Sequence, residues 1–341
     1  MLDTIIVGQG IAGSSLAYEL MKRGKKVMLI DNGHRHSASR ISAGLMQHVF
    51  GKFLTMNALI EDCFDEAIAF YKQLEKDFSC SFIKELDLYK QLTPLQEQIW
   101  EKKKKKAPYN KHLSQSLITR KQCSLSVHPA ISVSGNAVVD TERLLDAFKQ
   151  YFLSHNSYEL EQFEYAALKG CSDAVTYKQF QAKHIIFCTG SALSKHPLLT
   201  QLPFENVKGD TFTLNSNALS RTTALQAEFS LVPHSTQFRL GANYDHDLSH
   251  DRPTEKAYTA LQAYLKGLQL SDYELLCQHS ATRCILKDNL PIVGCHPKNK
   301  SIGFFSGFSS RGFITAPYFA MRWANEFPSF SLSEYHVARY L

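Results

Sequence analysis

The distribution of hydrophobic and polar residues over the first 31 positions predicts two strands with a helix between them. The apolar run TIIV at residues 4–7 is typical of a strand that is buried on both faces. After a glycine-rich turn, SSLAYELMKRG at residues 14–24 has Leu16 and Leu20 on one side, as in a helix. KKVMLID at residues 25–31 predicts the second strand. This order indicates a βαβ unit.

Three later segments extend the pattern. Residues 58–78, ALIEDCFDEAIAFYKQLEKDF, have the apolar spacing of an amphipathic helix. Residues 175–190, VTYKQFQAKHIIFCTG, predict an alternating strand, a turn near 179–181 and an apolar strand. Residues 301–327 read as a strand, a glycine-rich turn and an apolar helix. We expect the last two segments to return to the sheet that the N-terminal unit begins.

The glycine-rich turn has the spacing G-x-G-x-x-G, formed by Gly8, Gly10 and Gly13. Gly8 permits a tight turn, Gly10 lets the backbone approach a pyrophosphate, and Gly13 allows close packing of helix on strand. The helix N-terminus that follows favours an anion. Asp31, at the end of the second strand, can accept both ribose hydroxyls of an adenosine. The pattern predicts a dinucleotide site, with a turn that only packs as the alternative, and it does not distinguish FAD from NAD.

The stretch after Asp31 favours FAD. An NAD enzyme would continue directly into further βα units. Residues 32–57 are instead rich in Ser, Ala, Gly and basic residues, too polar for a third strand and too long for a tight turn. A loop that runs alongside an extended cofactor fits this composition better. An NAD dehydrogenase remains the alternative, and it would give a colourless preparation.

Composition sets broad limits. With 341 residues, 44% of them hydrophobic, the chain can form a large core or two domains. A net charge of +6 does not by itself indicate nucleic acid. There is no apolar run of about 18 residues and no room for a secretory signal before Asp3, so we expect a cytoplasmic chain without a membrane span. The eight cysteines form no C-x-x-C pair, so we expect reduced thiols and no metal site. The oligomeric state stays open.

Seven motifs follow one another along the chain: the N-terminal G-x-G-x-x-G with Asp31, SASRISAGL, NAVVDTERLLDAF, HIIFCTG, FRLGANYD, SATRCILKDNLPIVG and GFSSRGFITAP. Their order and spacing resemble the D-amino-acid oxidase-like (DAO) family of FAD-dependent oxidoreductases, which includes glycine, sarcosine and D-amino acid oxidases. Each motif is short and degenerate, but together they cover nearly the whole chain.

The resemblance implies an α/β fold with two interleaved domains. A discontinuous, Rossmann-like FAD-binding domain would comprise residues 1–50, 137–203 and 284–341. A substrate domain of α+β type, with an antiparallel sheet, would comprise residues 51–136 and 204–283. Strand-like runs (FTLNSN, EFSLVPH and FRLGANY) and the amphipathic stretch TEKAYTALQAYLKGL in the last of these ranges agree with this division.

The resemblance also implies which residues contact a non-covalent FAD. The expected contacts are Gly8, Gly10, Ile11, Ala12, Gly13, Asp31, Asn32, Ser39, Arg40, Ala43, Gly44, Leu45, Val175, Cys188, Thr189, Gly190, Gly307, Ser310, Arg311, Gly312 and Phe313. Arg40 would neutralise phosphate, with a solvated arginine as the alternative. Val175 would touch adenine, with strand packing as the alternative. The turn from Gly307 to Gly312 would place backbone N–H groups near flavin O2, where they stabilise the reduced anion.

Arg283 matches the family's arginine that grips the substrate carboxylate. A guanidinium makes two parallel hydrogen bonds to a carboxylate, and the alternative role for Arg283 is a structural ion pair. Tyr244, His48 and Arg311 are further candidates for the pocket, each with a packing or surface role as the alternative. Cys284 is offset from the position where some sarcosine oxidases attach flavin, which favours non-covalent binding.

These residues predict an FAD-dependent oxidoreductase that oxidises the C–N bond of a small amine or amino acid by hydride transfer to flavin N5. No dedicated general base is expected. One alternative is a flavoenzyme acting on an aminomethyl-modified tRNA base, because EKKKKKAP at residues 101–108 is strongly basic. Such a run is more typical of a solvated loop or helix end, and RNA binding normally adds aromatic platforms, so nucleic acid is not the expected partner. A non-catalytic flavin-binding module is the other alternative.

Overall fold

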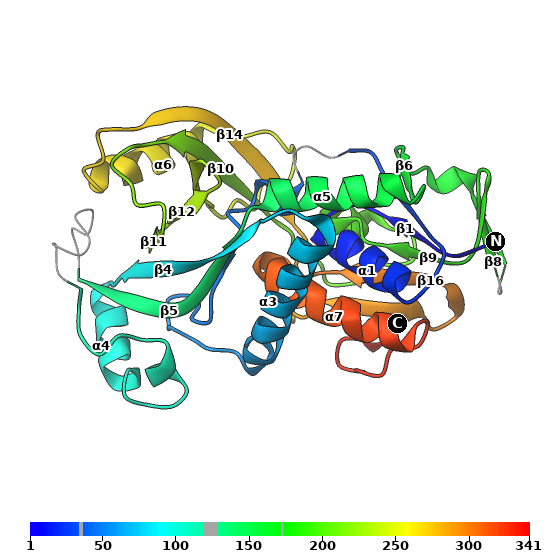
Figure 1. Cartoon of the computed structure of the whole chain (residues 1–341), viewed down its shortest axis with the longest axis horizontal. Helices are drawn as coiled ribbons and strands as arrows, with labels where there is room; N and C mark the ends of the chain where they lie inside the picture. The colour runs from blue at the N-terminus through cyan, green and yellow to red at the C-terminus, as the bar shows by residue number, and fades with distance from the viewer. Residues whose placement is uncertain (34–36, 119–128, 172–173) are drawn as a thin grey trace.

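Two mixed sheets of eight strands each form the framework of the protein (Figure 1). The computed structural model describes residues 1–33, 37–118, 129–171 and 174–341. The first sheet has the order β15-β16-β9-β1-β2-β6, with β8 pairing with β9 and β7 with β8, and the second has the order β14-β10-β13-β12-β11-β4-β5-β3.

The strands of the first sheet are β1 (Leu2–Val7), β2 (Val27–Asp31), β6 (Tyr158–Leu160), β7 (Leu168–Cys171), β8 (Ala174–Tyr177), β9 (Phe180–Phe187), β15 (Ile292–His296) and β16 (Asn299–Ser306). Those of the second are β3 (Leu45–Met46), β4 (Ile83–Gln91), β5 (Ala130–Val139), β10 (Val207–Asn215), β11 (Thr223–Gln226), β12 (Ser230–His234), β13 (Gln237–Gly241) and β14 (Glu274–Arg283). The α-helices are α1 (Ile11–Lys22), α2 (Ala38–Ile41), α3 (Ala58–Phe78), α4 (Pro94–Lys103), α5 (Thr141–Ser154), α6 (Glu255–Gly267) and α7 (Gly312–Glu326). Short 3₁₀ turns are η1 (Tyr109–Lys111), η2 (Tyr165–Ala167), η3 (Gly190–Lys195), η4 (Ser309–Arg311) and η5 (Val337–Tyr340).

The first sheet has a parallel centre that is buried on both faces. β1 pairs in parallel with β2 on one side and with β9 on the other, and β9 pairs in parallel with β16. Ile6 packs in the core that contains α1, α3, α5 and α7, whereas Ile5 and Val7 pack in the core on the opposite face. The predicted α/β fold and the two-sided burial of the first strand are therefore confirmed.

The helix predicted at residues 58–78 has the same bounds as α3. The side chain of Asn57 accepts a hydrogen bond from the N–H of Leu59 (2.9 Å), which caps the first turn. Ser79, with φ of 51°, ends the helix in the left-handed region. The neighbouring prediction needs a correction: residues 32–57 contain a two-residue strand, β3, because its backbone pairs with β5 of the second sheet despite the polar surroundings.

The second sheet is largely antiparallel. β10 pairs with β14 over the whole length of both strands and with β13 on its other side. Leu261 and Leu265 of α6 pack against Phe212 and its neighbours on one face of this sheet. We keep the division into two domains as a proposal, and note that the boundary expected at residues 136/137 falls inside β5.

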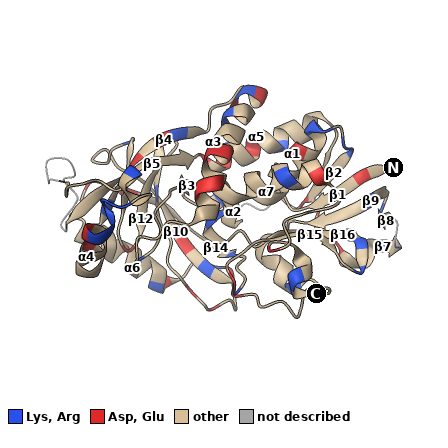
Figure 2. Cartoon of the chain, turned by 90° about the horizontal axis from the view of Figure 1, so that it is seen from below, with Lys and Arg blue, Asp and Glu red and all other residues tan. Residues whose placement is uncertain are grey.

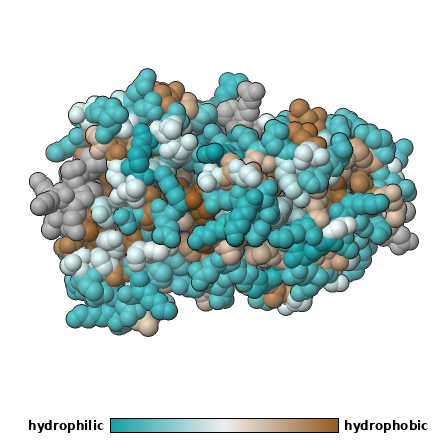
Figure 3. Space-filling model, viewed as in Figure 1, coloured by the Kyte–Doolittle hydropathy of each residue, from teal (hydrophilic) through white to brown (hydrophobic). Residues whose placement is uncertain are grey.

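The surface is mostly hydrophilic on the face shown in Figure 3, with hydrophobic residues in small, scattered groups. No helix of the described ranges is long and apolar enough to cross a lipid bilayer.

The lysine-rich run begins in the last turn of α4, where Figure 2 shows basic residues at one end of the molecule. The ammonium of Lys103 donates to the carbonyls of Phe53 and Leu54 (3.0 and 3.1 Å). The ammonium of Lys104 lies 3.9 Å from the centre of the Trp100 ring and pairs with Glu101. Two of the five lysines are therefore bound to the protein itself, and nothing in these contacts favours an RNA partner.

His196, directly after η3, is buried among aromatic rings. Its ring centre lies 4.5 Å from that of Phe187 and 5.0 Å from that of Phe304, and only 3% of its surface is exposed. Its Nδ1 accepts a hydrogen bond from the N–H of Leu198 (3.2 Å). Burial, with a smaller contribution from His296, lowers the pKa of His196 to about 4.

We expect His196 to make the protein less stable as the pH falls from about 6.5 to about 4, because the unfolded chain binds a proton there that the folded chain excludes. The contribution of neutral His196 to the free energy of unfolding is fully present above pH 6.5. At pH 4.5 the loss from this residue alone should be about 2–3 kcal/mol of unfolding free energy. Urea unfolding at pH 7.0 and 4.5 should therefore show a smaller pH effect in His196→Asn than in the wild type. An equal pH effect in both proteins would show that His196 titrates normally.

Candidate active site

The N-terminal glycine turn fits tightly against the end of β9. Gly8 has φ of +105°, and a Cβ there would lie 2.6 Å from the carbonyl oxygen of Cys188. A Cβ on Gly13 would lie only 1.9 Å from the carbonyl oxygen of Gly8. Two of the predicted glycines are thus required by the backbone itself, and the turn brings Cys188 and Thr189 to the start of α1.

Polar atoms surround the N-terminus of α1. Ser39 Oγ accepts a hydrogen bond from the N–H of Ile11 (3.1 Å), and a Cβ on Gly10 would meet no described residue other than Ser39 within 4 Å. The hydroxyl of Thr189 is buried and has no hydrogen-bond partner in the described part of the chain. Buried hydroxyls are normally paired, so this unpaired atom beside a helix N-terminus points to a missing polar ligand.

Asp31 is held at the end of β2 by the two turns that flank it. Its carboxylate accepts hydrogen bonds from the N–H of Gln9 (2.8 Å) and from that of Gly33 (2.7 Å). Asn32, next in the chain, donates its side-chain amide to Gln162 (2.5 Å). Since a carboxylate can accept about four hydrogen bonds, these contacts are compatible with ribose hydroxyls as further donors.

The second glycine turn lies beside the first. Gly307 has φ of +81°, and a Cβ on Gly312 would come within 3.3 Å of the Ile11 side chain. The N-termini of α1 and α7 are therefore side by side, although 300 residues separate them in the chain. The hydroxyl of Tyr71 in α3 donates to the carbonyl of Phe313 (2.7 Å) and fixes the first turn of α7.

The segment from Arg40 to Leu45 joins the two sheets. A Cβ on Gly44, which has φ of +68°, would lie 2.0 Å from the carbonyl oxygen of Val139 in β5. The guanidinium of Arg40 pairs with Asp146 of α5 (2.6 Å), so in this structure it is engaged with a carboxylate. Ala43 and Leu45 pack against the core of the second sheet.

Arg239 of β13, which the sequence did not single out as a site residue, holds this segment. Only 3% of its surface is exposed, and its Nη1 donates to the carbonyls of Arg40 (2.5 Å) and Ser42 (2.6 Å). Its Nη2 pairs with Glu142 of α5. The available signal was a lone cation within the apolar strand FRL, which indicates a buried guanidinium that needs partners.

His234 of β12 and Thr141 of α5 support the same contact. Thr141 donates its hydroxyl to the carbonyl of Arg40 (2.8 Å) and its N–H to Nε2 of His234 (3.2 Å). Burial, together with the charge of Arg239, keeps the pKa of His234 below its usual value. A neutral His234 can accept the hydrogen bond from Thr141, and its low pKa preserves that state near neutral pH.

Four segments bring cationic and aromatic side chains together near the second glycine turn. The guanidinium carbon of Arg283 lies 4.5 Å from the centre of the Tyr244 ring, and that of Arg311 lies 5.2 Å from the centre of the Phe50 ring. Arg283 donates to the carbonyl of Asn243 (3.0 Å). Of the predicted residues, the structure thus groups Arg283, Tyr244 and Arg311.

His48 takes part in a different cluster. Its Nδ1 lies 2.7 Å from Glu61, and its ring stacks on that of His112 at 4.0 Å with 25° between the planes. The ligand atoms of these three residues lie within 4.8 Å of one another, a set that the sequence did not reveal. An ion lies in the plane of each imidazole that binds it, so two stacked rings do not converge on one ion without rotating. We therefore interpret the cluster as a polar contact between α3, the loop after β3 and the loop after η1.

Val175 does not lie at the glycine turn. It pairs with Ala182, which pairs with Leu2 at the other end of β1 from Gly8, and it is buried in the core on that face. Gly190 and Ser310 are exposed at the ends of the two turns. Cys284 is buried, and burial raises the pKa of its thiol to about 11, so a nucleophilic thiolate is disfavoured there.

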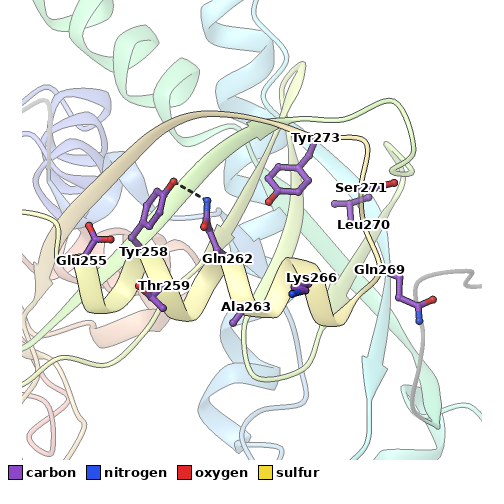
Figure 4. A pocket seen from close by; sticks show the side chains of 10 residues that line it. All are labelled: Glu255, Tyr258, Thr259, Gln262, Ala263, Lys266, Gln269, Leu270, Ser271 and Tyr273. Atoms are coloured by element: carbon purple, nitrogen blue, oxygen red, sulfur yellow. Dashed lines mark hydrogen bonds between the residues drawn. The ribbon is translucent and has the colours of Figure 1, made fainter.

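A separate hollow of about 630 Å³ lies between α6 and residues 269–273 (Figure 4). Tyr258 accepts a hydrogen bond from the side-chain amide of Gln262 (2.8 Å) at its rim. None of the predicted site residues lines it. We do not assign the hollow to the cofactor.

Residues 3–325 match the family model described as DAO, FAD dependent oxidoreductase. The chain belongs to this family. FAD is the family's cofactor, and the chain is an FAD-dependent oxidoreductase, as the sequence predicted.

Solved structures show the same fold as this FAD-dependent oxidoreductase. Iminodiacetate oxidase from Chelativorans sp. BNC1 is 17% identical with a TM-score of 0.81, covering 98% of both chains. Glycine oxidase from Geobacillus kaustophilus is also 17% identical, with a TM-score of 0.80, covering 100% of this chain and 99% of that one. Squalene epoxidase 4 of Arabidopsis thaliana is 41% identical over 64 residues, which are 19% of this chain and 12% of that protein. That match is local and supports no transfer of activity.

The residues at the two glycine turns fit FAD. The unpaired Thr189 hydroxyl, the small Gly10 and the start of α1 would hold the pyrophosphate, and Asp31 would bind the ribose. The N-terminus of α7 supplies the partial positive charge expected near flavin O2. These roles remain proposals for the individual residues.

Proposed function

We propose that this FAD-dependent oxidoreductase oxidises the C–N bond of a small amine, most simply of an amino acid. The observation that supports it best is the hydrogen bond from the N–H of Ser309 to the carbonyl of Cys284 (3.2 Å). It fixes the residue after Arg283 to the turn that begins α7. A cation suited to a carboxylate therefore adjoins the turn expected to face the flavin.

Arg283 has the surroundings of a substrate-binding group. Asn243 accepts one of its N–H groups, and Tyr244 covers one face of the guanidinium. A Cβ on Gly209 would come within 2.9 Å of Arg283 Nη2, so the glycine leaves room for the guanidinium. The remaining N–H groups can bind a carboxylate through two parallel hydrogen bonds.

The protein's contribution to the reaction is then orientation. Arg283 would hold the carboxylate so that the α C–H points toward the flavin, and the aromatic side chains of Phe50 and Tyr244 would hold the guanidiniums in place. Bound FAD supplies the acceptor for the hydride. With FAD bound, the α C–H would be lost as a hydride to the cofactor, and the resulting substrate imine would be hydrolysed by water. We propose non-covalent FAD, a small-molecule substrate and a cytoplasmic location with this activity.

Purified protein is expected to be yellow and to bleach anaerobically with at least one reductant from a panel of amino acids, N-methyl amino acids and hydroxy acids. Arg283→Ala should weaken the apparent affinity for carboxylate-bearing reductants by about tenfold to a hundredfold, because charge-assisted hydrogen bonds are lost. Carboxylate-free amines serve as the matched control and should be affected much less. Bound FAD that no amine reduces would contradict the proposal and favour a non-catalytic flavin-binding module.

A further inference from the structure

In the part of the chain that the structure describes, two arginines of the candidate site lack an acidic partner. Arg283 hydrogen-bonds a backbone carbonyl and stacks on Tyr244, and Arg311 stacks on Phe50. Among the described residues, neither guanidinium forms an ion pair with Asp or Glu. By contrast, Arg40, which begins the segment from Arg40 to Leu45, and Arg239, which holds that segment, each pair with a carboxylate.

The missing partner is most significant for Arg311, which is partly buried. Burial lowers the pKa of Arg311, and the neighbouring Tyr244 opposes this effect. Removing a cation from water is costly unless an anion accompanies it. An anionic ligand at this position would supply the partner that the chain does not.

The two guanidiniums belong to one site. The Ser309–Cys284 hydrogen bond joins η4, which ends at Arg311, to the residue after Arg283. Tyr244 stacks on Arg283 and is also a near neighbour of Arg311. Tyr244 is 68% exposed and both arginines are partly exposed, so the two guanidiniums are open to solvent.

We propose that the substrate is an amino or imino acid with two carboxylates, the first bound by Arg283 and the second by Arg311. This inference rests on the proposed C–N oxidation at the same site. Phe50 and Tyr244 keep the two cations in place by stacking. A substrate with one carboxylate would leave the charge of Arg311 unmatched.

The test is equilibrium binding of unreactive acids to the full-length, FAD-loaded protein. Calorimetry and the perturbation of the flavin spectrum measure the binding. Glutarate and succinate represent two carboxylates, and butyrate represents one. We expect wild type to bind the better dicarboxylate at least about tenfold more tightly than butyrate. Arg311→Met should abolish this preference and change butyrate binding by less than about threefold. Arg283→Met should weaken all three ligands.

Arg221→Met is the matched control, because Arg221 also stacks on an aromatic ring, that of Phe238 (4.4 Å), but is exposed in the bend before β11. It should leave the preference unchanged. Arg311→Lys keeps the charge and should retain part of the preference, which covers the case in which Arg311→Met fails to fold.

Equal binding of glutarate, succinate and butyrate by wild type would overturn the dicarboxylate inference, as would an unchanged preference in Arg311→Met. Either result leaves the proposed function intact if monocarboxylic amino acids bleach the flavin. Failure of every amine to bleach it would count against the proposed function, whatever the binding preference.

Discussion

Replacing Gly13 with alanine is expected to abolish FAD binding and to lower the free energy of unfolding by about 3 kcal/mol or more. The new Cβ would stand 1.9 Å from the carbonyl oxygen of Gly8 and 3.2 Å from Cβ of Cys188. Both contacts involve the backbone or atoms next to it, so no side-chain rotation relieves them. Either α1 moves away from β1 or the turn opens, and both changes displace the N–H groups proposed to bind the pyrophosphate.

Visible flavin absorbance of the purified protein and urea unfolding measure the two effects of Gly13→Ala. Gly267→Ala is the matched control, because Gly267 ends α6 and a Cβ there would meet nothing within 4 Å. The control should bind FAD normally and gain up to about 1 kcal/mol from the better helix propensity of alanine. A yellow Gly13→Ala protein with wild-type stability would show that the turn tolerates a side chain.

Replacing Arg239 with methionine is expected to reduce FAD affinity at least about tenfold and to lower the free energy of unfolding by about 2–4 kcal/mol. Methionine fills a similar volume but removes the guanidinium that donates to the carbonyls of Arg40 and Ser42, which then keep the Thr141 hydroxyl as a donor. The 40–44 segment, which the resemblance places along the flavin, then loses its main attachment to β13. Glu142 is half exposed and can be hydrated, so most of the cost comes from the carbonyls.

Reconstitution of the apoprotein with FAD, followed by flavin fluorescence, measures the affinity change in Arg239→Met. Arg239→Lys is the informative companion, since an ammonium keeps the charge but cannot reach several acceptors as the planar guanidinium does. We expect the FAD affinity of Arg239→Lys to lie between those of the wild type and Arg239→Met. If Arg239→Met is unstable yet binds FAD as tightly as wild type, Arg239 has only a structural role.

The sequence was informative where local periodicity and backbone requirements decide the structure. α3 was predicted to the residue because its apolar spacing is regular and Asn57 caps it. Gly8 and Gly13 could be interpreted from spacing because the turn demands glycine whatever surrounds it. The strands on either side of α1 were predicted because each is a short apolar run.

The sequence was less informative where distant segments meet. The distance of Val175 from the glycine turn depends on the register of β8 on β9 and of β9 on β1, which no local pattern encodes. The contacts of Arg239 join residues 97 to 199 positions apart, and the His48, Glu61 and His112 cluster joins α3 to two separate loops. Such contacts depend on tertiary packing, so a single sequence gives the residue type without its partner.

The order of strands β16-β9-β1-β2 has a consequence for synthesis of the chain. β1 leaves the ribosome first, yet its neighbour β9 is about 180 residues later, and α7, which packs beside α1, is about 120 residues later still. The cofactor pocket can therefore close only after α7 has emerged. Until then the apolar faces of β1 and α1 lack their covering elements, and a nascent chain halted before α7 presents them to chaperones and proteases.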